Sequence, residues 1–133
     1  MKKRLMFSIV SILILALLSG CGLKGAGYKV EQQAGQYSVS FTLAGKPAVG
    51  DNYATVIIKD ASGAVVSNAQ VQIDYTMPAM PGMPAMNYNA VAPLTGNEYT
   101  ATINLPMSGS WNIVVKFAVG GQTQKINFSI DAR

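Results

Sequence analysis

The sequence of 133 residues contains no histidine and a single cysteine, Cys21. Catalytic triads and zinc sites that need histidine or several cysteines are therefore excluded, and no intramolecular disulfide can form. No glycine-rich phosphate loop follows a strand and opens a helix. The carboxylates are few and scattered, and most flank the ends of expected strands: Glu31, Asp51, Asp60, Asp74, Glu98 and Asp131. We predict that the protein is not an enzyme.

The N-terminal segment has the composition of a secretory signal. A basic head at residues 2–4 precedes an apolar run over 5–18, which is shorter than the roughly 20 residues of a spanning helix. The ending Leu-Ser-Gly-Cys at 18–21 resembles a bacterial lipobox, which implies cleavage before Cys21 and a lipid on its thiol. An ordinary signal beside a spare thiol is the alternative. Because Gly22 stands where an inner-membrane retention signal has Asp, the outer membrane is favoured in a cell with two membranes.

The charge balance excludes one class of partner. The chain carries a net charge of +4, and Lys2, Lys3 and Arg4 supply three of these positive charges. Without them, seven Lys and Arg oppose six Asp and Glu, which leaves a net charge of +1. A nearly neutral domain has no field to attract a polyanion, so we do not expect nucleic-acid binding.

The pattern of apolar residues predicts an all-β domain. We expect a signal peptide over 1–20, a lipidated Cys21 with a flexible glycine-rich tether over 21–35, and one β-domain over 36–133. Apolar and polar residues alternate in several short runs separated by Gly, Pro and Asn, and no stretch shows a helical period. About seven antiparallel strands in an immunoglobulin-like β-sandwich fit this pattern, and a small barrel is the alternative. The expected strands cover 37–43, 53–59, 70–76, 87–94, 99–105, 111–119 and 126–130.

Four methionines recur at every third residue in the segment 77–86, separated by small residues and prolines: Met77, Met80, Met83 and Met86. Thioether sulfur is a neutral, soft ligand that favours Cu(I), or Ag(I) by analogy, over hard cations. The segment therefore predicts a Cu(I) site in an exported protein. The alternative is an apolar loop that caps the sandwich or docks on a protein partner without metal.

The backbone of this segment decides how many sulfurs can meet. A polyproline II helix would set successive methionines about 9 Å apart, which is too far for two sulfurs to share one ion. A type II turn at Met80-Pro81-Gly82-Met83 would bring the outer Cα atoms within about 7 Å. We therefore expect Met80 and Met83 to form the core pair of ligands. Met77, Met86 and Met107 are candidates for a third sulfur.

Trp111 begins a cleanly alternating run, which predicts a core position. The alternative is a cation–π contact between its ring and a bound Cu(I) ion. The sequence leaves both interpretations open.

Several runs resemble the YtkA-like/FixH-like domain family: Met-Pro-Ala-Met-Pro-Gly-Met-Pro at 77–84, Gly-Asn-Glu-Tyr at 96–99 and Pro-Met-Ser-Gly-Ser-Trp at 106–111. Upstream turns at 50–52 and 60–63 fit the same family pattern. The resemblance covers about residues 36–130. It implies an immunoglobulin-like sandwich in an exported, membrane-attached protein, with relatives linked to copper delivery for haem–copper oxidase assembly or fused to heavy-metal efflux adaptors. A copper efflux or oxidase-assembly protein is therefore the expected partner, although a lipid anchor here replaces the spanning helix of the FixH branch.

Overall fold

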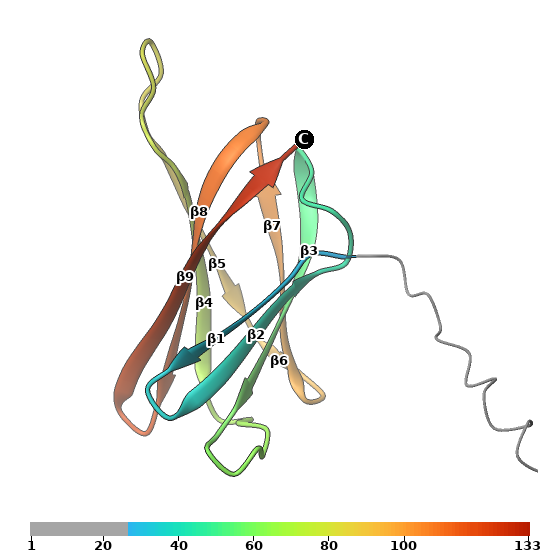
Figure 1. Cartoon of the computed structure of the whole chain (residues 1–133), viewed down its shortest axis with the longest axis vertical. Helices are drawn as coiled ribbons and strands as arrows, with labels where there is room; N and C mark the ends of the chain where they lie inside the picture. The colour runs from blue at the N-terminus through green and yellow to red at the C-terminus, as the bar shows by residue number, and fades with distance from the viewer. Residues whose placement is uncertain (1–26) are drawn as a thin grey trace, which may run out of the picture.

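Two antiparallel sheets pack face to face in a β-sandwich (Figure 1). The computed structural model describes residues 27–133, and no helix occurs among them, so none there could span a membrane. The strands are β1 (Lys29–Ala34), β2 (Tyr37–Leu43), β3 (Gly50–Lys59), β4 (Gln70–Met77), β5 (Met86–Ala92), β6 (Leu94–Thr95), β7 (Glu98–Leu105), β8 (Gly109–Val119) and β9 (Gln122–Ala132). The all-β prediction is confirmed.

The strand order identifies the kind of sandwich. One sheet has the order β1-β2-β3-β7-β6 and the other has the order β5-β4-β8-β9. From β2 onward, the first sheet contains the A, B and E strands of an immunoglobulin-like domain, and the second contains C′, C, F and G. Because the two sheets are separate, the barrel alternative is excluded.

Strict alternation along the strands builds the core between the sheets. In β8, Trp111, Ile113, Val115 and Phe117 are buried, and the residues between them face outward. Because the side-chain period of a strand is two, every second residue of such a run faces the opposite sheet. Among the described residues 27–133, the nine strands and the buried cluster lie within 29–132, so this part of the chain has a hydrophobic core of its own, as a domain that can fold alone does.

One tyrosine side chain holds the connection between β3 and β4 through hydrogen bonds. Tyr99, fully buried in β7, donates its hydroxyl hydrogen to the carbonyl oxygen of Val66 at 2.8 Å. The same hydroxyl oxygen accepts a hydrogen bond from the backbone N–H of Ala69 at 3.0 Å. Two backbone groups of the crossing segment are thus satisfied by a single side chain.

Two strands were missing from the prediction, which expected about seven. Residues 29–34, placed in the tether, form β1 and pair with β2 through the turn after Ala34. The tether prediction is therefore wrong over these residues. The reason is that Val30 is the only large apolar residue of β1, so the strand has no alternation of apolar and polar residues from which it could be predicted. The other missing strand, β6, has only two residues.

Candidate functional site

The methionine segment forms a long hairpin that projects beyond one end of the sandwich (Figure 1). At its base, Met77 of β4 pairs with Met86 of β5. At its tip, Met80 and Met83 form an isolated antiparallel bridge. Both pairs belong to one continuous register, and the two-residue loop Pro81-Gly82 closes it. Methionines equally spaced in sequence are thus matched in pairs across the hairpin.

The tip has the turn that the sequence predicts. The N–H of Met83 donates to the carbonyl oxygen of Met80 at 2.8 Å, and the N–H of Met80 donates to the carbonyl oxygen of Met83 at 3.0 Å. Gly82 has a φ of 81°, which the third position of a type II turn requires and which glycine adopts without strain. The next hydrogen-bonded pair of this register would join Pro78 and Ala85, and Pro78 has no N–H to donate, so the ladder is interrupted between the tip and the base.

Burial divides the four methionines into two groups. Met80 and Met83 are 43% and 38% exposed, and every residue from 78 to 85 is exposed with them. Met77 is only 2% exposed and belongs to the core. Met86 is partly buried and packs against that core. The structure therefore brings Met80 and Met83 together at an open tip and places Met77 among structural residues.

The base of the hairpin is closely packed. A Cβ atom at Gly109 would lie 3.0 Å from the Cε of Met77, so the methionine methyl group rests on this glycine. Met107, two residues earlier, is partly buried against the core. Its carbonyl oxygen accepts a hydrogen bond from the indole N–H of Trp111 at 3.1 Å. Met107 thus lies at the hairpin end of the sandwich, on the turn that leads into β8.

Trp111 occupies the core position that its alternating run predicts. Its side chain has no exposed surface, and its N–H is already bound. It offers no open face to a cation at the hairpin tip, so the cation–π interpretation has no support in this geometry.

An exposed aromatic residue nearby was not singled out from the sequence. Tyr88 of β5 is 41% exposed and stacks on Tyr75 with a centroid distance of 5.6 Å. Its ring lies 6.2 Å from that of Trp111. The position of Tyr88 could have been found from the expected hairpin, because the register that pairs Met77 with Met86 also pairs Tyr75 with Tyr88.

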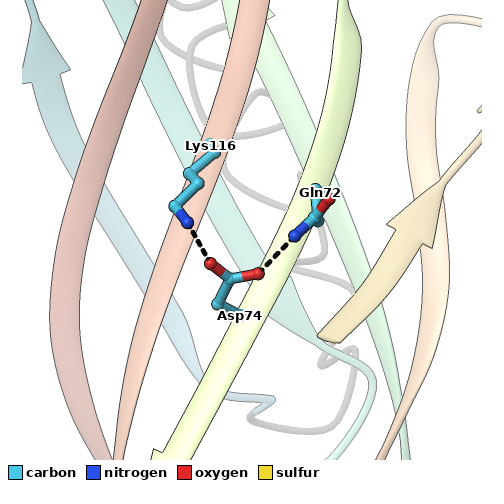
Figure 2. A network of polar contacts seen from close by, with 3 residues as sticks. All are labelled: Gln72, Asp74 and Lys116. Carbon is cyan, nitrogen blue, oxygen red and sulfur yellow. Dashed lines mark hydrogen bonds and ion pairs between the residues drawn. The ribbon is translucent and has the colours of Figure 1, made fainter. Parts of the chain in front are cut away.

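No charged residue occurs between Asp74 and Glu98, so the hairpin and β5 are electrically neutral. The charge that is closest to the hairpin in sequence belongs to a polar network on the outer face of β4 and β8 (Figure 2). There the Asp74 carboxylate forms an ion pair with Lys116 and accepts a hydrogen bond from the Gln72 side chain at 2.6 Å. Partial burial raises the pKa of Asp74, but the contacts with Lys116 and Gln72 outweigh it, so the net pKa is lowered.

Other parts of the described chain present weaker candidates. Within residues 27–133, no three His, Cys, Asp or Glu side chains gather in a group that could hold a metal ion. An open groove of about 570 Å³ lies at the opposite end of the sandwich, between Ala69–Gln72 and Pro93–Leu94. Lys116 is the only charged residue in its lining, so the groove has no set of ligands or catalytic groups. The lipidation candidate Cys21 and the signal segment lie outside the described residues.

Comparison with known proteins identifies one family. A family model described as YtkA-like matches residues 31–116, from within β1 to within β8, and this range includes the whole methionine hairpin. Neither the curated proteins nor the solved structures contain a significant match.

Proposed function

The chain belongs to the YtkA-like family, and we propose that it is a lipid-anchored envelope protein that binds Cu(I), or Ag(I), at the tip of its methionine hairpin. One observation carries the proposal. Met80 and Met83 face each other across a two-residue turn, exposed at the end of a projecting hairpin. The protein would bind the ion rather than catalyse a reaction, and would buffer it or pass it to a partner in copper efflux or oxidase assembly.

The ligands at the tip match the chemistry of a soft cation. Thioether sulfur binds Cu(I) without losing a proton, and the neutral hairpin supplies no carboxylate that would favour Ca²⁺ or Mg²⁺. The open tip leaves room for a partner's ligand to approach the same ion. The other methionines are less suited as a third sulfur. Met77 is enclosed by the core and Met107 lies on another loop, while Met86 lies three residues from Met83 in the hairpin register, an odd step that turns its side chain to the opposite face.

A competition titration tests the proposal. Residues 27–133 are titrated with Cu(I) in the presence of a chromophoric Cu(I) chelator. We expect Met80→Leu/Met83→Leu to weaken binding at least about tenfold, which corresponds to about 1.4 kcal/mol. Met107→Leu is the matched control, since this methionine lies outside the hairpin, and it should change the affinity little. Unchanged affinity in the double variant would refute the proposed tip site.

The pH dependence gives a second test of the same ligands. Cysteine and histidine sites lose affinity on acidification because protons compete with the metal. A thioether site has no such competition. After correction for the chelator's own protonation, the Cu(I) affinity should therefore be constant between about pH 5 and 8. A steep decrease towards pH 5 would contradict a site built from methionine alone.

The second candidate function is protein docking without metal. The same exposed tip is apolar and carries no charge, as the centre of a binding surface commonly does. Leucine keeps most of the apolar volume of methionine, so Met80→Leu/Met83→Leu would preserve docking while removing the metal. Met80→Glu/Met83→Glu would abolish both. Pull-down with the two double variants from envelope extracts separates the functions.

A further inference from the structure

In the four-stranded sheet, the edge formed by β5 lacks the protection that the edge formed by β9 has. Strand β5 is the outermost strand of its sheet and pairs on one side only, with β4. Eight large apolar residues are exposed in the described chain, and five of them lie within residues 80–94: Met80, Met83, Tyr88, Val91 and Leu94. Tyr88 and Val91 lie in β5 itself, Met80 and Met83 lie in the hairpin that precedes it, and Leu94 follows it in β6.

The opposite edge of the same sheet is closed by side chains. The hydroxyl of Tyr28 donates to the carbonyl oxygen of Ser129 at 3.2 Å, and the Gln32 side chain donates to that of Asn127 at 3.0 Å. Both acceptors are backbone groups of the edge strand β9. Two carbonyl groups of that edge are thus satisfied within the chain.

Strand β5 shows none of the features that usually prevent edge pairing. Natural edges are commonly protected by lysine, proline, a bulge or a very short strand. The sequence Met-Asn-Tyr-Asn-Ala-Val-Ala of β5 contains no charge and no proline. Its seven residues pair with β4 in an unbroken register, so no bulge turns the edge away. The strand is therefore suited to accept another strand.

The side chains of β5 are complementary to themselves. Four side chains of β5 lie on the same face as the buried residues of β4 with which they pair: Met86, Tyr88, Ala90 and Ala92. Along the strand, two large residues therefore precede two small ones. In an antiparallel pair of β5 strands centred on Asn89, Tyr88 would lie opposite Ala90 of a second copy, and Met86 opposite Ala92. Each large residue would meet a small one. With no charge on the strand, the two-fold axis would bring no like charges together.

We propose that β5 pairs with β5 of a second copy of this chain, in an antiparallel register centred on Asn89, to form a two-fold symmetric dimer. The pairing would join two four-stranded sheets into one of eight strands and cover the exposed ring of Tyr88. The two methionine hairpins would then project from opposite ends of the joined sheet. Dimer formation and metal binding are therefore separate properties that succeed or fail independently.

Charge-swapped variants at 87 and 91 test both the dimer and its register. Both side chains are exposed and face outward, and their β4 neighbours, Thr76 and Gln72, are uncharged. In the proposed dimer, Asn87 lies opposite Val91 of the second copy. Asn87→Lys/Val91→Lys and Asn87→Glu/Val91→Glu therefore place like charges opposite each other in each homodimer, whereas a mixture pairs Lys with Glu.

Sedimentation equilibrium on residues 27–133 should show a wild-type dimer with a dissociation constant below about 1 mM. Each double variant alone should raise that constant at least about tenfold, and the equimolar mixture should restore association. The control Thr123→Lys/Asn127→Lys, with the same spacing on exposed positions of β9, should dimerise as the wild type does. A thermal melt confirms that each variant is folded. A monomeric wild type, an undiminished dimer in the lysine variant or a mixture that stays monomeric would each overturn the proposal.

Discussion

Truncating the methionines one at a time should separate those that hold the fold from those at the tip. Met77→Ala removes three heavy atoms from a side chain that is almost wholly enclosed and leaves a cavity against Gly109. Such truncations of a buried methionine cost about 2–5 kcal/mol. Met80→Ala removes the same atoms from an exposed side chain on the projecting tip, where surface substitutions change stability by about 0.5 kcal/mol or less.

Urea unfolding of residues 27–133, followed by tryptophan fluorescence, measures the difference. Trp111 is the only tryptophan and is buried in the core, so its emission reports global unfolding. A loss of 2–5 kcal/mol with a slope of about 2 kcal/mol per molar urea lowers the midpoint by about 1–2.5 M for Met77→Ala. The midpoint for Met80→Ala should stay within about 0.3 M of the wild type. Equal midpoints for the two variants would refute the division into buried and exposed methionines.

Two further predictions concern polar contacts. Tyr99→Phe leaves the carbonyl of Val66 and the N–H of Ala69 without their shared partner, and should lower the free energy of unfolding by about 2 kcal/mol in the same urea assay; no change would mean that water replaces the hydroxyl. Asp74→Asn should remove about 0.5–1 kcal/mol at neutral pH, because the pair with Lys116 is partly exposed. Since the pKa of Asp74 is lowered in the folded state, its contribution is present above the ordinary value of 3.8 and is lost as the pH falls through the folded pKa. The variant should therefore lose less stability than the wild type below pH 3.8, and parallel pH profiles would contradict this assignment.

Local patterns in the sequence were sufficient for most of the fold. Strands such as β8 alternate cleanly enough to predict both their existence and their buried face. The turn at Pro81-Gly82 was also predictable, because proline and glycine are restricted to the conformations that a type II turn needs. These features depend on near neighbours in the chain, which is why the sequence alone reveals them.

Features that depend on distant contacts were not visible in the sequence. Strand β1 alternates weakly and is held by pairing with β2 and by hydrogen bonds to β9, about 100 residues away in sequence, from the side chains of Gln32 and of Tyr28 just before the strand. The even spacing of the methionines does not separate the enclosed Met77 from the open Met80, and only the alternation of β4, which extends to Met77, favours a buried side chain there. The enclosure of Met77 depends on Gly109 at the start of β8, against which its methyl group packs.

The most direct test of the central claim is residue-resolved observation of the methionine methyl groups. Residues 27–133 contain five methionines, so selective ¹³C-methyl labelling gives five assignable NMR signals. Titration with Ag(I), a soft cation that stands in for Cu(I) without its redox chemistry, should shift the signals of Met80 and Met83 together and saturate at one equivalent. The enclosed methyl of Met77 should not respond at the same point. Unmoved signals for Met80 and Met83 in the presence of excess Ag(I) would contradict the account.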